Sequence, residues 1–255
     1  MGRVRIDPAH VLGDFTPARI AVAIVGSRKP APESRAIARK LAALVVREGG
    51  VVVSGGADGI DAEAHEGALE AGGRTWCVLG CGAPNFTPFE QRARDILARG
   101  GAVIRPFPEG TRGLPQNYLH RNRVIMTLAP IVVAIQAADR SGTLHASNEA
   151  RKLGCELWVV PGLGDGFVGS WRLVAKGAKI LRHEDELAAR LRAPELHGDA
   201  RLVYETLAEG AKHPDQIVLE TGLSTSAVAT ALLTLALGDV VVEGSAGLYE
   251  RKILL

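Results

Sequence analysis

The chain has 255 residues, of which 47% are hydrophobic and 23% are charged, and its formal net charge is +2. This length is enough for one large and one small domain, and the composition predicts a packed core and excludes a largely disordered chain. The small net charge neither requires nor excludes nucleic acid, so a nucleic-acid site would have to come from local clusters of basic residues.

The cysteines and the hydropathy pattern predict the compartment. The three cysteines, Cys77, Cys81 and Cys155, form no paired framework, which is typical of a reducing compartment, and they are too few donors for a metal site. No apolar stretch approaches the roughly 18 residues needed to span a bilayer, and the N-terminal segment has no secretory signal. We therefore expect a soluble, cytoplasmic protein with no metal, no cofactor and no membrane contact.

From Arg19 onward, apolar runs rich in β-branched residues alternate with segments of helical periodicity such as residues 31–48. The predicted strands are Ile20–Val25, Val51–Ser54, Trp76–Leu79, Val103–Pro106, Ile131–Gln136, Leu157–Val160 and Lys179–Leu181. Strands that are almost wholly apolar are expected to be covered on both faces. Their alternation with helices predicts right-handed βαβ units and a doubly wound, mostly parallel α/β sheet.

A polar stretch with proline and glycine, residues 192–200, predicts a linker between a domain at 20–191 and a domain at 201–255, with residues 1–19 as an N-terminal extension. The predicted elements of the second domain are helices at Arg201–Leu207, His213–Thr221 and from an N-cap at Ser224 to about Leu237, and a hairpin of Asp239–Glu243 with Leu248–Arg251. Three helices followed by a two-stranded wing are typical of a small winged helix-turn-helix.

Three glycine-rich loops follow predicted strands of the large domain, at Val25–Lys29, Ser54–Asp61 and Asp139–Thr143. Ligands of doubly wound sheets bind at this edge, where backbone amides approach anions closely, and two of the loops also carry arginine. Tight βα turns need glycine for structural reasons as well. No P-loop lysine motif and no G-x-G-x-x-G follows the first strand, which disfavours nucleotide hydrolysis and ordinary dinucleotide binding. Together the loops favour an anion site.

Two further groups of residues could carry chemistry. Asp61 and His65 lie four apart on one predicted helix face and could orient each other by a hydrogen bond, as an acid–base pair would. With no nucleophile or metal cluster beside them, a structural or loop-orienting role is favoured. The segment Asn117–Arg123 mixes arginine with aromatic and amide side chains, which suits single-stranded nucleic acid, although such a cluster is more often a solvated helix face.

These motifs resemble the DNA-processing protein A (DprA/Smf) family, in the same order and at similar separations. The matching segments are Ala23–Lys29, Val53–Leu69, Val78–Gly82, His120–Ile125, Asp139–Leu144, Val159–Gly162 and Gly177–Lys179. The match covers roughly residues 20–190, and the C-terminal segment resembles the winged-helix module that many members carry. The chain departs from the family pattern at Asp58, where a basic residue is common, at Thr127–Pro130 and at His145.

The resemblance implies an extended Rossmann-like fold that binds single-stranded DNA and delivers a RecA-type recombinase onto it, in natural transformation (competence) or another DNA recombination pathway. It also implies a homodimer and no catalytic activity, so the protein is not expected to be an enzyme. Carried over motif by motif, the DNA and phosphate contacts are Gly26, Ser27, Arg28, Lys29, Ser54, Gly55, Gly56, Arg121, Asn122, Arg123, Arg140, Ser141, Gly142, Thr143 and Lys176.

Two alternatives remain open from the residues. The same loops could serve a sensor of nucleotides or nucleotide derivatives, or an enzyme resembling the nucleoside-monophosphate phosphoribohydrolases. Their Pro-Gly-Gly-x-Gly-Thr-x-x-Glu motif is only partly matched by Gly142, Thr143 and a displaced Glu149. A third reading makes the winged helix a reader of duplex DNA. Its candidate reading helix, which begins at Ser224, starts without arginine or lysine, so a protein-contact or dimer role is at least as well supported.

Overall fold

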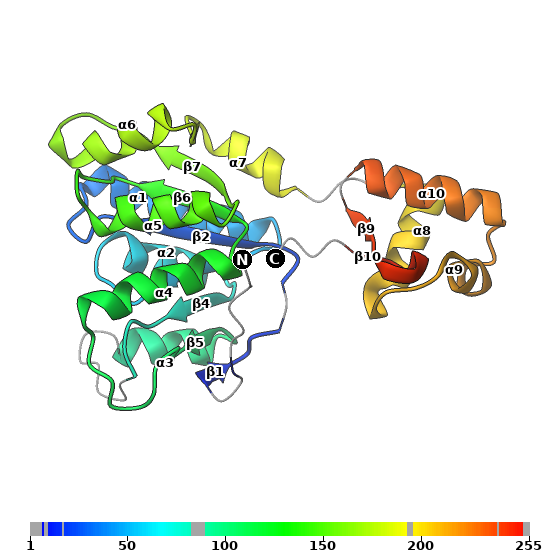
Figure 1. Cartoon of the computed structure of the whole chain (residues 1–255), viewed down its shortest axis with the longest axis horizontal. Coiled ribbons are helices and arrows are strands. Elements are labelled where there is room, and N and C mark those ends of the chain that lie inside the picture. Colours follow the sequence, from blue (N-terminus) through cyan, green and yellow to red (C-terminus); the bar gives the residue numbers. More distant parts are fainter. Residues whose placement is uncertain are drawn as a thin grey trace. The chain divides into compact units, whose positions relative to one another are not determined.

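The computed structural model describes residues 7, 10–16, 18–82, 90–192, 196–238 and 240–251, which form two compact units divided between Leu191 and Arg192. An eight-stranded sheet lies at the centre of the first unit, in the order β1-β5-β4-β3-β2-β6-β7-β8 (Figure 1). Its strands are β1 (Val11–Gly13), β2 (Ala21–Gly26), β3 (Val51–Gly55), β4 (Thr75–Val78), β5 (Ala102–Ile104), β6 (Ile131–Ile135), β7 (Glu156–Val160) and β8 (Lys179–Ile180).

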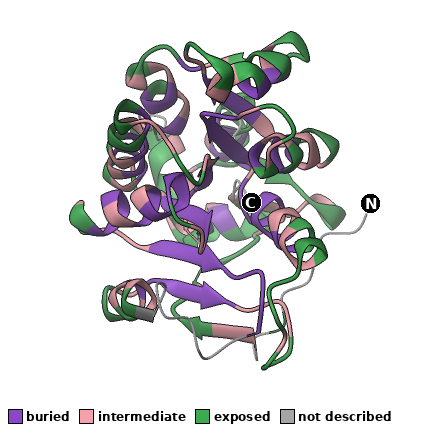
Figure 2. Cartoon of the chain, turned by 90° about the vertical axis from the view of Figure 1, so that its left-hand side faces the viewer, coloured by how far each residue is buried: buried purple, intermediate pink, exposed green. Residues whose placement is uncertain are grey.

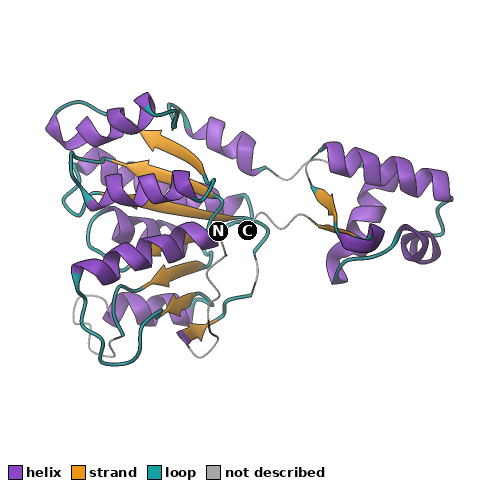
Figure 3. Ribbon diagram, viewed as in Figure 1, coloured by secondary structure: helices purple, strands orange, loops and turns teal. Residues whose placement is uncertain are grey.

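Helices cover both faces of this sheet (Figure 3). They are α1 (Pro32–Arg47), α2 (Ile60–Glu70), α3 (Glu90–Ala98), α4 (Pro115–Leu128), α5 (Gly142–Lys152), α6 (Val168–Ala175) and α7 (Glu184–Leu191). Successive strand residues point to opposite faces, so Ala23 packs against the layer of α4, α5 and α6, whereas Ile24 packs against the layer of α1, α2 and α7. Figure 2 shows the buried strands between helices whose outer faces are exposed. Burial on both sides explains why the strands are almost wholly apolar.

The predicted fold class is confirmed, and each of the seven predicted strands is present as β2 to β8 with ends shifted by at most two residues. The sequence did not predict β1. This strand lies in the segment set apart as an N-terminal extension, and it pairs antiparallel with β5 at the sheet edge, Leu12 opposite Val103. It is three residues long and two of them are exposed, so it has no apolar run to recognise.

The second unit is the predicted winged helix. Its elements are α8 (Gly198–Thr206), α9 (Pro214–Thr221), α10 (Thr225–Leu237) and the antiparallel pair β9 (Val241–Glu243) and β10 (Tyr249–Arg251). Ser224 is the N-cap of α10, as expected, and its Oγ accepts a hydrogen bond of 3.2 Å from the Ala227 amide. Val203, Ile217 and Leu235 belong to a core of its own. Asp239 of the predicted hairpin and residues 193–195 of the predicted linker lie outside the described residues.

The described residues contain neither a single membrane-spanning helix nor a metal cluster. No single helix is long and apolar enough to cross a membrane; α9 and α10 together meet the criterion of length and composition, but a bend of 114° separates them. Within the same part of the chain, no group of three or more histidine, cysteine, aspartate or glutamate side chains is arranged to hold a metal ion.

Candidate nucleic-acid interface

A pocket of about 400 Å³ lies at the carboxyl ends of β2 and β6. The strand order reverses between these two neighbours, which is the position where doubly wound sheets bind ligands. Three segments supply most of its wall: the end of β2 with Gly26–Arg28, the first half of α4 with Tyr118–Asn122, and the start of α5 with Ser141–Thr143. Ala57 and Asp61 of the loop after β3 line it as well, so all three predicted glycine-rich loops meet the predicted arginine segment in one pocket.

The loop after β2 presents an exposed cation. Gly26 is required here because a Cβ atom would lie 2.3 Å from the carbonyl oxygen of Ile135. The Ser27 Oγ accepts a hydrogen bond of 3.1 Å from the Lys29 amide, which shapes the turn. Beyond it, the Arg28 guanidinium carbon lies 5.3 Å from the centre of the Tyr118 ring, within range of a cation–π contact. The ring thus orients an arginine that is otherwise exposed to solvent.

Arg121 occupies the floor of the same pocket. Its side chain is 6% exposed, and its Nη1 lies 3.4 Å from Oδ2 of Asp61. The guanidinium fits only because Gly55 lacks a side chain, since a Cβ atom there would lie 1.2 Å from Nη1 of Arg121. No described residue accepts a hydrogen bond from its Nε. The floor is thus a buried ion pair, and its arginine is not free to reach out.

The two acid–base candidates have different partners from those expected. Burial raises the pKa of Asp61, and the guanidiniums of Arg121 and Arg28 offset part of that rise. His65 is not the partner of Asp61: its Nε2 lies 3.1 Å from the Gly55 carbonyl oxygen and its Nδ1 lies 2.8 Å from the Thr75 hydroxyl. Burial lowers the pKa of His65 to about 3, so the ring is neutral. The expectation that these two residues orient each other is wrong; each supports the end of β3 from a different side.

The start of α5 adds a second source of positive potential. Ser141 is its N-cap, with Oγ accepting a hydrogen bond of 3.1 Å from the Leu144 amide. Gly142 and Thr143 follow in the first turn, at the helix end whose free amides and macrodipole favour anions. Arg140, just before the cap, is exposed and has a positive φ of 54°. An anion in the pocket would meet this helix end opposite the loop of Arg28.

Gln136 is a residue of this site that the sequence did not reveal. It follows β6 with a positive φ of 52°, which is rare for a residue other than glycine. Its Oε1 accepts a hydrogen bond of 2.8 Å from the Ala31 amide, so it ties the end of β6 to the loop that carries Arg28. Strained backbone of this kind gathers at functional sites. The only signal in the sequence is a polar residue directly after an apolar strand.

The remaining predicted residues are not all brought to the pocket. Ser54 is buried and its Oγ donates a hydrogen bond of 2.6 Å to the Ile24 carbonyl, which joins β3 to β2. Gly56 and Arg123 are half-buried and lie outside the pocket lining. Lys176 is exposed after α6 and lies three residues before the start of β8, so it lies toward the amino ends of the strands, the opposite edge of the sheet. The pocket therefore gathers Gly26, Ser27, Arg28, Arg121, Asn122, Ser141, Gly142 and Thr143.

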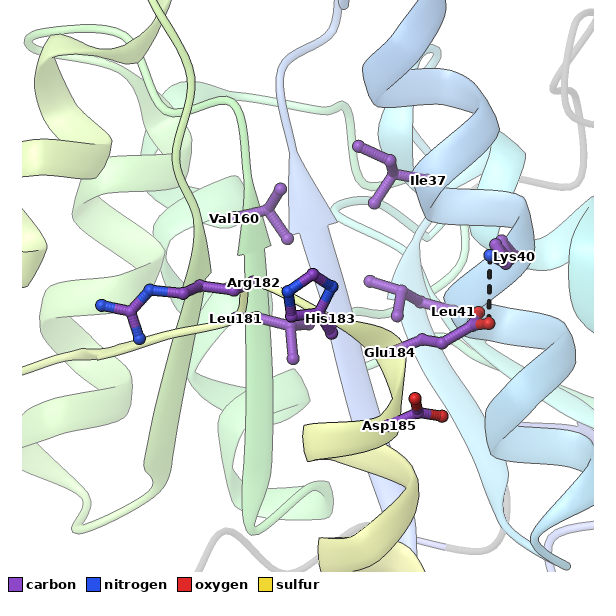
Figure 4. A pocket seen from close by; sticks show the side chains of 9 residues that line it. All are labelled: Ile37, Lys40, Leu41, Val160, Leu181, Arg182, His183, Glu184 and Asp185. Carbon is purple, nitrogen blue, oxygen red and sulfur yellow. Dashed lines mark ion pairs between the residues drawn. The ribbon is translucent and has the colours of Figure 1, made fainter.

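A second pocket, of about 280 Å³, lies between α1 and the start of α7 (Figure 4). Ile37 and Leu41 project from α1 toward Val160, so much of its wall is apolar. Lys40 and Glu184 pair across the opening at 3.0 Å. Arg182 and His183 also line it, but Glu184 and Asp185 stand beside them, and no glycine-rich loop or helix N-terminus of the kind that holds an anion lines it apart from the acidic start of α7. The pocket at β2 and β6 is therefore the better candidate site for an anion.

Comparison with known proteins identifies the same two units. The family model described as DNA recombination-mediator protein A matches residues 10–192, and the model of the DprA winged helix domain matches residues 188–247. Protein Smf from Synechocystis is 30% identical over 268 residues, which cover 91% of this chain and 66% of that relative. The chain thus spans slightly less than two thirds of the length of this curated relative.

Two solved structures are similar to the large unit. One is DNA processing protein A from Helicobacter pylori, and that structure concerns the protein's single-stranded DNA binding mode. The two chains are 28% identical with a TM-score of 0.65, and the match covers 71% of this chain and 85% of the other. The second is DNA processing protein A from Streptococcus pneumoniae, 31% identical with a TM-score of 0.61, covering 70% of this chain and 62% of the other.

Proposed function

Because this chain belongs to the DNA recombination-mediator protein A family, we propose that it binds single-stranded DNA in the pocket between the ends of β2 and β6. The family membership also confirms the resemblance seen in the sequence motifs. The observation that carries the proposal is the meeting of an exposed arginine, Arg28, with the N-terminus of α5 across a pocket whose floor holds the buried guanidinium of Arg121. An exposed cation and a helix N-terminus thus meet on one small volume, above a buried ion pair.

Each wall of the pocket has a chemical counterpart in a nucleotide. Arg28 and the free amides of Gly142 and Thr143 suit phosphate oxygens. Tyr118 and Asn122, on the α4 wall, offer a ring and an amide to sugar and base. Contacts of this kind are mostly to the backbone, so we expect little preference for sequence. The similar Helicobacter pylori protein, whose structure concerns its single-stranded DNA binding mode, supports the proposal.

We propose a binding role and not a catalytic one. Asp61, the carboxylate that lines the pocket, is already paired with Arg121, and burial raises its pKa. His65 is buried behind β3 and neutral, without access to the pocket lining. Neither group is placed to activate a nucleophile or to transfer a proton to a ligand. The site therefore supports holding a strand, and we propose that it does so in the cytoplasm.

The test is a fluorescence-anisotropy titration of the whole protein with a labelled single-stranded oligonucleotide and the matching duplex, each at two salt concentrations. We expect preference for the single strand, and an affinity that falls with salt by a log–log slope of about 0.7 for each phosphate contacted. No binding to either form by the folded protein would refute the proposal. Binding of a free mononucleotide without binding of the oligonucleotide would favour the alternative function, a nucleotide sensor.

We further propose that the bound strand is handed to a RecA-type recombinase during DNA uptake or recombination. A protein that contacts mainly the sugar-phosphate backbone of the DNA leaves the bases free to pair, and a factor that loads a recombinase must do this. The test is the ATPase activity of a RecA-type recombinase on oligonucleotide already coated with a single-strand binding protein. We expect this chain to shorten the lag before hydrolysis begins. A lag that is unchanged at saturating protein would contradict recombinase loading while leaving DNA binding intact.

A homodimer is the oligomeric state that we propose for this function. Support comes from apolar side chains left exposed on the segment after β7, notably Leu163 and Trp171. A second copy that covers them would remove an apolar surface from water. Sedimentation equilibrium of the wild type should give twice the chain mass, and Trp171→Glu should shift it toward the monomer. Leu114→Glu, at a similarly exposed leucine, is the control. A monomeric wild type would contradict the dimer.

A further inference from the structure

The two units carry opposite net charges, although the whole chain is nearly neutral. Residues 1–191 contain 25 lysine and arginine residues against 19 aspartate and glutamate residues, whereas residues 192–255 contain 5 against 9. The formal charges are thus +6 and −4. Duplex DNA carries a dense negative charge, and proteins bind it chiefly through lysine and arginine. An acidic winged helix is therefore poorly suited to bind DNA, whatever its fold resembles.

Helix α10 lies where a winged helix-turn-helix presents its reading helix, yet none of its 13 residues is ionisable. Its inner side packs on the core of the second unit through Val228, Leu232 and Leu235. On the outer side, Leu233 is 61% exposed and Leu237 is 80% exposed. The two leucines are four residues apart and so lie next to each other on one helix face. Adjacent exposed leucines on an uncharged helix mark a contact surface for protein and not for phosphates.

A shallow groove runs beside these leucines. It has a volume of about 300 Å³ and lies between α8 and α10, where small side chains keep it open. Ser226, Thr230 and Thr234 line it from α10, and each follows the previous one after four residues. Thr230 and Thr234 also border the leucines, since Leu233 and Leu237 each lie three residues further along. We call the surface formed by Ser226, Thr230, Leu233, Thr234 and Leu237 the α10 face.

Acidic side chains stand on both helices that pack against α10. Asp199 lines the groove from α8, and Glu205 is exposed on the same helix. Asp215 and Glu220 are exposed on α9. Ion pairs of Arg201 with Glu205 and of Lys212 with Glu220 offset two of these charges, but the unit keeps its acidic excess. The α10 face is therefore an uncharged strip, with two exposed leucines, on an acidic unit.

We propose that the α10 face docks an amphipathic helix of another protein, one whose apolar side chains are flanked by lysine or arginine. The apolar side of such a helix covers Leu233 and Leu237 and sets small or medium side chains into the groove, as in other helix-in-groove complexes. Its basic flanks complement the acidic surroundings, which steers association and sets specificity. A second copy of the unit fits less well, because two units of charge −4 repel each other.

The test uses the full chain and two labelled synthetic peptides that form amphipathic helices. One peptide is made of leucine and lysine, and the second has every lysine replaced by glutamate. We expect the lysine peptide to bind, with anisotropy that falls as salt is added, and the glutamate peptide to bind weakly or not at all. Leu233→Ser and Leu237→Ser should each weaken binding about tenfold, as expected for a leucine that loses its apolar burial.

Two further variants distinguish binding at the α10 face from nonspecific binding of the peptide. Leu219→Ser removes a leucine of α9 that is 84% exposed and lies outside the α10 face, so binding should not change. Thr230→Arg places a bulky cation in the groove and should abolish binding of the lysine peptide. All four positions are exposed, so circular dichroism should show folded proteins.

Three results would overturn the proposal. The first is equal peptide binding by the wild type and both leucine variants. The second is self-association that Leu233→Ser removes, which would make a second copy the occupant. The third is duplex binding by the wild type that Leu233→Ser and Leu237→Ser both weaken, which would make the helix a DNA contact after all. None of these outcomes depends on single-stranded DNA binding by the first unit, so failure here and failure of the proposed function are distinguishable.

Discussion

Arg121 Nη1 lies 3.4 Å from Asp61 Oδ2 beneath the pocket, in an ion pair whose side chains are 6% and 8% exposed. Taking two charges out of water is costly, and each charge is tolerated in the interior because the other compensates it. Loss of either partner would therefore leave an uncompensated buried charge. The pair also joins α4 to the start of α2, two segments that border the pocket. The buried pair thus sets the position of the pocket floor.

Asp61→Asn should destabilise the first unit strongly. It removes the carboxylate and leaves the guanidinium of Arg121 buried without a counter-charge, which typically costs about 3 kcal/mol or more. Urea unfolding measures the change. The control is Glu70→Gln on the same helix, where an exposed pair with Arg39 should contribute less than about 1 kcal/mol. Equal stability of the two variants would show that the pair does not support the fold.

Gly55→Ala tests how closely Arg121 must approach the end of β3. An added Cβ would lie 1.2 Å from Nη1 of Arg121 and 2.5 Å from Oδ2 of Asp61, so the guanidinium must move. We expect lower stability and, because the floor charge shifts, single-stranded DNA binding weaker by about tenfold, as for one lost charged contact.

Gly142→Ala is the matched control for stability, because nothing lies within 4 Å of the added Cβ in the first turn of α5. The alanine should leave the unfolding free energy unchanged or raise it by up to about 1 kcal/mol. The same loss of stability in both variants would mean that the close fit at Gly55 has no special role.

The main strands and the winged helix could be predicted because their signals are local. Buried parallel strands such as β6 are apolar at every position, and a serine before an apolar helix, as at Ser224, is an N-cap signal. The short edge strand β1 could not be predicted, since its pairing with β5 depends on residues about 90 positions away and its own sequence has no pattern.

The candidate site was predictable in outline but not in its contacts. Strand assignment and parallel topology predicted that the loops after β2 and β6 lie at the same edge of the sheet. That Gly26 and Gly142 line one pocket depends on the pairing of β2 with β6, which the sequence did not predict. The sequence did not reveal which charged side chains pair with each other in the site. Helical spacing favoured Asp61 with His65, but the open space at Gly55 admits Arg121, and that choice depends on packing between α2 and α4.

Arg28→Ala should weaken single-stranded DNA binding about tenfold for every oligonucleotide sequence, because a contact to phosphate carries no base information. The log–log salt slope should fall by about 0.7, the value for one phosphate on a single strand. Arg47→Ala is the control, since this exposed arginine lies in the last turn of α1, at the opposite edge of the sheet. If Arg28→Ala keeps the wild-type affinity and salt slope, Arg28 does not contact the DNA.

His65 predicts a dependence of stability on pH that one substitution can isolate. Burial lowers the folded-state pKa to about 3 from an ordinary value of 6.5. As pH falls below 6.5, the unfolded chain therefore takes up a proton that the folded chain does not. The stability contributed by neutral His65 is fully present above pH 6.5 and is lost as pH falls toward 3, at up to about 1.4 kcal/mol per pH unit.

His65→Gln should flatten that dependence. Other groups also titrate, so the quantity to measure is the difference in unfolding free energy between wild type and variant, at about pH 7.5 and about pH 5.5. The difference should shrink by about 1.3 kcal/mol at the lower pH, because only the wild type loses the His65 contribution. His145→Gln, at an exposed histidine, should keep the wild-type slope. A difference that is the same at both pH values would mean that folding does not exclude the proton from His65, and that the hydrogen bonds to Gly55 and Thr75 hold a charged ring.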